Sequence, residues 1–196
     1  MDTKPNVKQS LLYRTHTIIY STVQTLNLVL DRVKLPVNFL TDIIFSMDKD
    51  ILTKFLLNAR TKTYAGHMGR VKPLLQGSKQ LEYKDGNWLY RDIFNIGNNK
   101  FAGLETIYFN NKPVWSMSYY GNYEKMTEEE ADKTLRKALI DKWEDVRIWK
   151  NVEYKMGDYT YINEGSGNID EVEGSEKIEK NGETVFFFYY AGAFIG

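Results

Sequence analysis

Apolar side chains in the first 46 residues recur at helical spacing. Leu12, Ile19, Val23 and Leu30 follow one another at intervals of three, four or seven residues, which predicts one long helix over residues 10–34. Pro36 interrupts the pattern, and a short second helix is expected over 37–47. We expect residues 1–46 to form a helical extension. It either caps the main domain or serves as an arm, residues 10–46, through which two copies of the chain associate.

Beyond residue 80 the periodicity changes to the alternation of β-strands, with turn residues between short apolar runs. Asn and Gly tolerate the positive φ that a tight hairpin turn needs. The expected hairpins are 81–83 with 88–92, 104–109 with 114–120, and 175–179 with 185–190, turning at Asp85-Gly86, Asn110-Asn111 and Asn181-Gly182 respectively. Residues 186–190 are all aromatic, so both faces of this last strand are apolar. That pattern predicts a central strand covered on both sides.

A helix is expected before each set of strands. Thr127 and Glu130 form a capping box, followed by an apolar face that includes Leu135 and Trp143. Asp48 is expected to cap an earlier helix with Leu52 and its neighbours on the buried side.

Residues 81–121 resemble residues 152–192 at a constant offset of 71, with twelve identities in 41 positions. We interpret this likeness as an internal duplication. The expected fold is α+β, with two helix-plus-four-antiparallel-strand units about a pseudo-twofold axis and the N-terminal helical extension. The two units would form either one broad sheet or two facing half-sheets. Residues 47–196 would then be a single duplicated domain, with copy one at 48–121 and copy two at 127–192.

The composition excludes several kinds of chemistry. The chain of 196 residues has no cysteine and two histidines, which excludes disulfides, thiol nucleophiles and thiolate metal sites. Neither His16 nor His67 has a ligand partner at recognisable spacing, so no metal and no cofactor are expected. No apolar run is long enough to cross a bilayer, and no signal peptide is evident. We therefore expect a cytoplasmic protein with no membrane partner.

The formal net charge of zero conceals an uneven distribution. Residues 1–121 hold 16 basic and 9 acidic side chains, and residues 122–196 hold 10 and 17. The segment 60–79 carries five basic residues, three glycines and no acid. It is therefore either an anion-binding loop, suited to an anionic small molecule, or an ordinary solvated connection. A chain that is neutral as a whole is not expected to bind nucleic acid.

Aromatic and carboxylate side chains mark the candidate site. Trp88, Tyr90 and Asp92 share one strand face, a composition that suits the stacking and hydrogen bonding of a sugar-like ligand, although plain cross-strand packing gives the same pattern. The candidate ligand-binding residues are Tyr64, Arg70, Trp88, Tyr90, Arg91, Asp92, Trp115 and Tyr119.

Three acids are candidates for catalysis. Glu105 and Glu176 have the same parity as Ile107 and Ile178, so on the core face each carboxyl group would be buried and its pKa raised. With Asp92, such groups could act as an acid and base pair. The alternative is that each carboxylate caps a turn or pairs with a lysine.

Several strings in this chain resemble a family of uncharacterised, mostly bacterial proteins known as domain of unknown function 5680. The strings are LTKFLLNA at 52–59, TYAG at 63–66, GSKQLEY at 77–83, YRD at 90–92, FAGLE at 101–105, KPVWSMSYYG at 112–121, GDYTY at 157–161 and YAG at 190–192. The resemblance covers residues 47–196. It implies no established activity. Some members follow a helix-turn-helix domain, which residues 1–46 do not resemble.

The sequence favours a non-enzymatic small-ligand-binding or sensory module, with an aromatic and basic site in copy one. The alternatives are a hydrolase using the paired carboxylates, with Arg91 steadying an oxyanion, and a structural protein that dimerises through its N-terminal helices.

Overall fold

The computed structural model describes residues 37–143 and 148–196, with side chains described from residue 49 onward. The predicted helix over 10–34 lies outside the described residues. Two units are distinguished, residues 1–48 and residues 49–196. The account below concerns the second unit.

Helix α2 spans Val37–Arg60 and passes directly into a π-helical turn, η1, at Thr61–Ala65. The two helices predicted over 37–47 and around Leu52 are therefore one helix, and the prediction that Asp48 caps a new helix is wrong. Leu52, Leu56 and Ala59 are buried as the apolar pattern requires.

Helix α3 spans Glu128–Asp141, and its start confirms the predicted capping box. The Thr127 hydroxyl accepts a hydrogen bond from the Glu130 amide, and the Glu130 carboxylate accepts one from the Thr127 amide. Leu135 is buried as expected, whereas Trp143 lies beyond the helix and is exposed. In the part of the chain that is described, neither helix has the length and apolar character needed to cross a bilayer.

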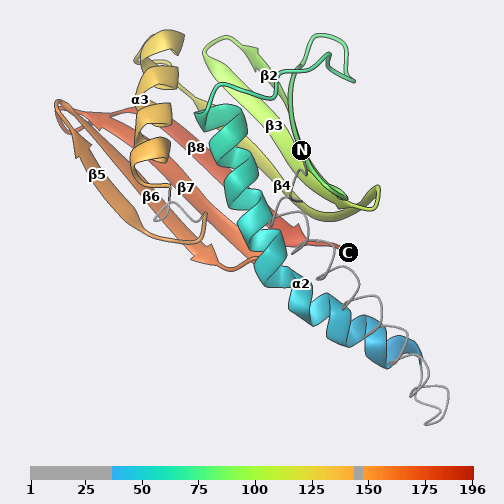
Figure 1. Cartoon of the computed structure of the whole chain (residues 1–196). Coiled ribbons are helices and arrows are strands. Elements are labelled where there is room, and N and C mark those ends of the chain that lie inside the picture. The colour runs from blue at the N-terminus through green and yellow to red at the C-terminus, as the bar shows by residue number, and fades with distance from the viewer. Residues whose placement is uncertain (1–36, 144–147) are drawn as a thin grey trace, which may run out of the picture. The chain divides into compact units, whose positions relative to one another are not determined.

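Eight strands form one antiparallel sheet in the order β1-β2-β3-β4-β8-β7-β6-β5 (Figure 1). Their bounds are β1 Lys79–Asp85, β2 Trp88–Gly97, β3 Lys100–Phe109, β4 Lys112–Asn122, β5 Val152–Met156, β6 Tyr159–Gly167, β7 Glu171–Lys180 and β8 Glu183–Phe194. The three predicted hairpins are confirmed, and their strands are longer than expected. Gly86, Asn110, Asn111, Asn181 and Gly182 have the positive φ that the turns require.

The predicted pair of helix-plus-four-strand units is wrong. β4 pairs with β8 along eight positions, from Trp115 opposite Phe194 to Asn122 opposite Phe187, so the eight strands form one sheet that shares one hydrophobic core with the two helices. Of the two packing alternatives, one broad sheet is the one observed. The two helices also differ, because α2 has 24 residues and leads into η1, whereas α3 has 14. The recurring sequence pattern reflects similar hairpins within one sheet.

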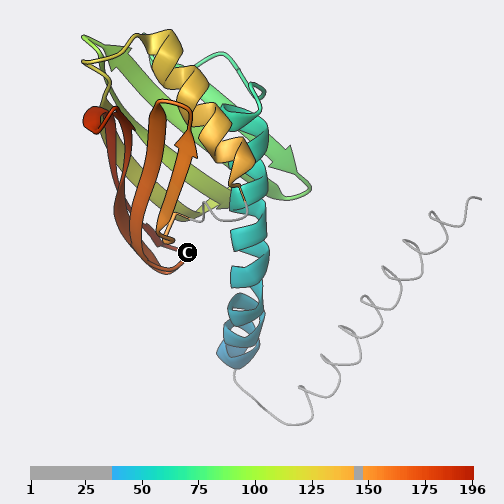
Figure 2. The same cartoon turned by 90° about the vertical axis from the view of Figure 1, so that its left-hand side faces the viewer.

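Residues 49–60 of α2 and the whole of α3 lie against the same face of the sheet, which we call the helix-covered face (Figures 1 and 2). Phe186, Phe188 and Tyr190 of β8 point to this face and are buried. β8 is central in the sheet, as predicted. The prediction that it is covered on both sides is wrong, because Tyr189 on the opposite face is 58% exposed.

We predict that Thr127→Ala lowers the free energy of unfolding by about 1 kcal/mol, because the Glu130 amide at the start of α3 loses the hydroxyl that accepts its hydrogen bond. Urea unfolding followed by circular dichroism measures the change. Thr134→Ala in the interior of the same helix is the matched control and should leave stability within about 0.5 kcal/mol of the wild type. Equal losses in the two variants would contradict the capping role.

Candidate functional site

A cavity of about 510 Å³ lies between the helices and the helix-covered face of the sheet. Its lining includes residues of α2, η1, α3 and strands β1, β2, β3, β4, β7 and β8. The alternation of each strand sends every second side chain toward the helices, so residues distant in sequence meet here. Cavities of this size are typical of small-molecule sites.

Arg60 ends α2 and turns its side chain toward the sheet. Its Nη2 lies 3.1 Å from Oε1 of Glu105, forming an ion pair in which the arginine side chain is 20% exposed. Burial disfavours the charged guanidinium, but the neighbouring charges of Glu105 and Glu176 outweigh that effect and raise the pKa of Arg60. Arg60 is therefore a fixed cation within the cavity wall.

Three carboxyl groups line the cavity around this arginine. Asp92 of β2 lies directly opposite Glu105 of β3, and Glu176 comes from β7. All three residues are at most 5% exposed. The prediction that Glu105 and Glu176 lie on the core face is confirmed. The partner of Glu105 is Arg60 rather than a lysine.

Burial raises the pKa of Asp92 to about 8, and the negative charge of Glu105 adds to this effect. A hydrogen bond from Tyr119 and the charge of Arg60 act in the opposite direction without cancelling it. Burial likewise raises the pKa of Glu176 to about 7, although Arg60 opposes the shift. One guanidinium is therefore insufficient to keep all the carboxyl groups charged, and the cluster retains protons near neutral pH.

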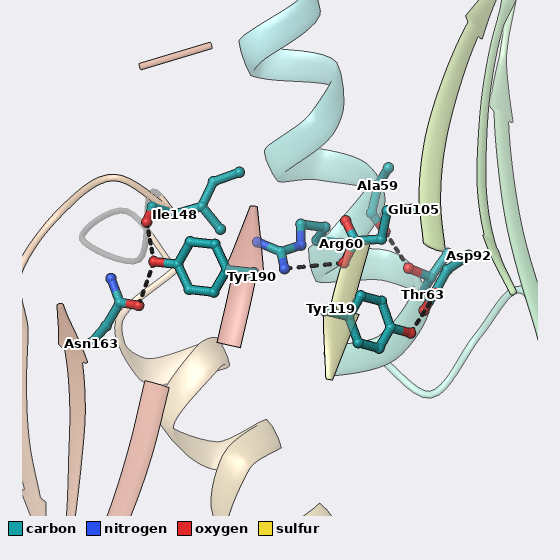
Figure 3. A network of polar contacts seen from close by, with 9 residues as sticks. All are labelled: Ala59, Arg60, Thr63, Asp92, Glu105, Tyr119, Ile148, Asn163 and Tyr190. Atoms are coloured by element: carbon teal, nitrogen blue, oxygen red, sulfur yellow. Dashed lines mark hydrogen bonds and ion pairs between the residues drawn. The ribbon is translucent and has the colours of Figure 1, made fainter. Parts of the chain in front are cut away.

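Tyr119 of β4 lies directly opposite Gly103 of β3 in the sheet, and its side chain passes over this glycine. Its hydroxyl group reaches Asp92 (Figure 3). Its hydroxyl donates a hydrogen bond of 2.6 Å to Oδ1 of Asp92. A methyl group at Gly103 would lie 2.4 Å from the Tyr119 hydroxyl oxygen, so only glycine leaves room for the ring. Burial and the nearby Asp92 raise the pKa of Tyr119, which keeps the hydroxyl a hydrogen-bond donor.

A similar tyrosine and glycine arrangement on β6 to β8 has asparagine in place of the aspartate. Tyr190 lies over Gly174, and its hydroxyl hydrogen-bonds to Oδ1 of Asn163 at 2.9 Å and to the carbonyl oxygen of Ile148 (Figure 3). Asn163 takes the place that Asp92 has on the other side. The carboxyl groups that the sheet brings to the cavity are therefore Asp92 on β2, Glu105 on β3 and Glu176 on β7.

One oxygen of the cluster has no partner. Oε2 of Glu105 is buried and receives no hydrogen bond, although Oε1 of the same group pairs with Arg60. An unsatisfied buried carboxylate oxygen costs ~1–3 kcal/mol or more. Such a group retains full capacity to accept a hydrogen bond from a molecule that enters the cavity.

Aromatic rings form the apolar wall. Phe101 stacks against Phe186 and Phe188, with ring centres 5.7 and 5.9 Å apart. Tyr119 packs on Phe188 at 5.1 Å. The cavity thus places a large apolar surface beside a charged cluster.

Ion pairs occupy the outer lining. Arg136 of α3 pairs with Asp132 at 2.7 Å and lies over the Tyr64 ring at 4.2 Å. Lys79 lies 3.4 Å from Glu128 across the exposed end of the cavity. The charges in this outer part are therefore largely balanced.

The structure brings together most of the residues that the sequence singled out. Those that line the cavity are Tyr64, Arg70, Tyr90, Asp92, Tyr119, Glu105 and Glu176. Trp88 packs beside Phe55 and Phe109 instead, and Trp115 is fully buried in the core. Arg91 pairs with Glu82 at 2.7 Å, on the strand position between Tyr90 and Asp92 that faces away from the helices.

The basic residues of segment 60–79 point in different directions. Arg60 enters the acidic cluster, Lys62 lies over the Tyr83 ring and bonds to its hydroxyl, and Lys79 faces Glu128. Arg70 lines the cavity and forms an isolated bridge to Leu81. The segment therefore does not present one convergent basic surface.

Sequence reasoning did not identify Arg60 as the partner of the carboxyl groups. Arg60 follows Leu52 and Leu56 at intervals of four residues, which places it on the buried side of α2. This four-residue spacing is the one feature of the sequence that indicates an inward-facing Arg60. The roles of Phe101, Asp132 and Arg136 were also missed, because each looks like an ordinary core or surface residue in its own element.

Within residues 49–143 and 148–196, no three histidine, cysteine or carboxylate side chains are grouped closely enough to hold a metal ion. The side chains of the acidic cluster thus line a common cavity without forming a coordination site.

A family model described as Domain of unknown function (DUF5680) matches residues 92–195. Comparisons with curated proteins and with solved structures gave no match. The matched segment starts at Asp92 and contains Glu105, Tyr119 and Glu176, but it excludes Arg60 and the rest of α2.

We predict that Asp92→Asn stabilises the chain increasingly as pH rises from about 4 to 8. Asp92 binds a proton more tightly when folded than when unfolded, so its contribution to stability is present at low pH and is lost toward its folded pKa of about 8. The neutral side-chain amide of the Asp92→Asn variant does not titrate, so the variant does not lose this stability as the pH rises. Urea unfolding at pH 5 and pH 8.5 should show the variant gaining more than about 1.4 kcal/mol relative to wild type, the equivalent of one pKa unit.

Glu124→Gln, on an exposed residue outside the cavity, is the matched control and should show a pH-independent difference. An Asp92→Asn variant that tracks the wild type at both pH values would contradict the buried, proton-retaining state.

Proposed function

We propose that this chain, which belongs to the family described as Domain of unknown function (DUF5680), binds a small organic molecule in the cavity between its helices and its sheet. The observation that carries the proposal is a cavity of about 510 Å³ in which a buried carboxylate oxygen of Glu105 has no protein partner. A cavity of this volume with a few convergent polar groups is typical of ligand sites.

The lining supports an amphiphilic ligand. Phe101, Phe186 and Phe188 offer a continuous aromatic wall for an apolar body. Arg60, Asp92 and Glu105 offer polar partners at the buried end. A molecule with an apolar ring system and one polar group would satisfy both parts.

Filling the cavity tests the proposal. Ala131 of α3 lines it and is buried, so Ala131→Phe would occupy part of the volume. We predict that wild-type protein binds the neutral probe 1-naphthalenemethanol, measured by titration calorimetry, and that this variant binds it at least about tenfold more weakly. Lys133→Phe adds the same ring on an exposed position of α3 outside the cavity and should leave binding unchanged.

Overpacking costs ~1–3 kcal/mol, so a urea melt of Ala131→Phe must show that the variant is folded under the assay conditions. Binding that survives in a folded Ala131→Phe variant would place the probe elsewhere and contradict the proposal.

A second candidate function is hydrolysis by the paired carboxyl groups. Asp92 and Glu105 are direct cross-strand neighbours, whose Cβ atoms are typically ~4.5–5.5 Å apart. Asp92 is suited to act as an acid and Glu176 as a base, because their pKa values of about 8 and about 7 lie near neutral pH. Arg60, rather than Arg91, is the cation available to an oxyanion.

For this candidate, we predict a rate of phenyl ester or phenyl glycoside hydrolysis that rises with pH through about 7 and falls through about 8. Phenolate is a poor leaving group that benefits from protonation, so release of phenol should fall at least about a hundredfold in Asp92→Asn and stay unchanged in Glu124→Gln. Turnover of these substrates at the same rate in both variants would contradict the role of the cluster.

Association of two copies through residues 10–46 stays a prediction, since residues 1–36 lie outside those described. The same holds for a cytoplasmic location.

A further inference from the structure

The inner end of the cavity holds more acidic than basic groups. Asp92, Glu105 and Glu176 surround Arg60, the one basic side chain that the described lining brings to them. The outer acids Asp132 and Glu128 are already paired with Arg136 and Lys79. An excess of carboxyl groups therefore remains at the buried end of the cavity.

One oxygen of the cluster lacks a hydrogen bond, although the hydroxyls of Tyr90 and Tyr161 lie near Glu105 and Glu176. Tyr119 donates to Asp92, and Arg60 donates to one oxygen of Glu105, but Oε2 of Glu105 receives nothing. Glu105 is only 4% exposed, so bulk water does not compensate this oxygen. A ligand that donates an N–H group would satisfy it.

Without a ligand, bound protons neutralise the carboxyl groups of Asp92 and Glu176, as a positively charged ligand would. Asp92 and Glu176 have raised pKa values because they are buried near like charges with one arginine to balance them. A second positive charge in the cavity would favour their ionised forms, so its binding would release protons.

The aromatic wall suits the rest of a cationic molecule. Tyr119, Phe101 and Phe188 lie beside the carboxyl cluster, and their ring faces attract a positive charge within about 6 Å. The same rings cover an apolar body by burial.

We infer that the ligand of this cavity is an organic ammonium compound, with its N–H groups directed at Glu105, Asp92 and Glu176 and its apolar body against Phe101, Phe186 and Phe188. This inference rests on the proposed binding function and names the class of molecule. It differs from the anionic ligand that segment 60–79 led us to expect.

Three probes with one naphthalene body test the inference: 1-naphthylmethylamine, 1-naphthalenemethanol and 1-naphthoate, which are cationic, neutral and anionic at neutral pH. Titration calorimetry at pH 7.5 measures each affinity. We expect the amine to bind at least about tenfold more tightly than the alcohol, and the carboxylate to bind most weakly. Titrations in two buffers of different ionisation enthalpy should show proton release with the amine alone.

Variants assign the preference to the cluster. Glu105→Gln should remove the preference, so that the amine binds this variant no more tightly than the alcohol does. Glu176→Gln provides the same readout if the first variant does not fold, and Glu124→Gln is the exposed control.

The outcomes separate the two proposals. If the alcohol or the carboxylate binds as tightly as the amine, and Ala131→Phe abolishes that binding, the ammonium inference fails while the binding function stands. If none of the three probes binds to wild-type protein, or if Ala131→Phe leaves their binding intact, the proposed function fails and the inference with it. Amine binding without loss in Glu105→Gln and Glu176→Gln would likewise overturn the inference.

Discussion

The buried ion pair between Arg60 and Glu105 joins the end of α2 to the middle of the sheet. Neither charge would be stable alone in this position, because desolvation of an isolated ion costs several kcal/mol. Each therefore requires the other, and the pair requires α2 to end at the cavity. The acidic neighbours Asp92 and Glu176 then depend on the same guanidinium for whatever ionisation they retain. The helix, the sheet and the protonation of the cavity are thus coupled through one side chain.

Glycine positions determine how close the aromatic side chains can approach the sheet. Gly103 and Gly174 each lie opposite a tyrosine, and each lacks the Cβ that would collide with its hydroxyl. The ring of Tyr119 can therefore lie flat enough to reach Asp92, and that of Tyr190 to reach Asn163. An aspartate on one side and an asparagine on the other make these similar frameworks differ in charge, which gives the cavity one acidic end.

Local patterns predicted the elements well, because turns and caps depend on few residues. Asn110-Asn111, Asn181-Gly182 and the Thr127–Glu130 box are satisfied by interactions within their own segments. The pairing of β4 with β8 joins residues about 70 apart, and no local pattern distinguishes it from two separate units. The prediction that both faces of β8 are covered was wrong for the same reason, because a run of aromatic residues does not show whether one or both faces of the strand are covered. Most strands and turns were therefore predictable, whereas the choice between one broad sheet and two half-sheets was not.

The candidate site shows the same division. Strand parity put Glu105 and Glu176 on the same face as Ile107 and Ile178, and Asp92 on the same face as Tyr90, because alternation is a property of the strand itself; all of these residues are buried. It did not reveal which cation they meet, since Arg60 reaches them from another element. A basic segment rich in glycine indicates anion binding only if its cations remain available, and here Arg60 and Lys79 face carboxylates of the same chain. The charge that suits a ligand therefore depends on the charged groups of the cavity that are not already paired with one another. In this cavity the remainder is an excess of carboxyl groups that retain protons, and the buried Oε2 of Glu105 is the oxygen that receives no hydrogen bond.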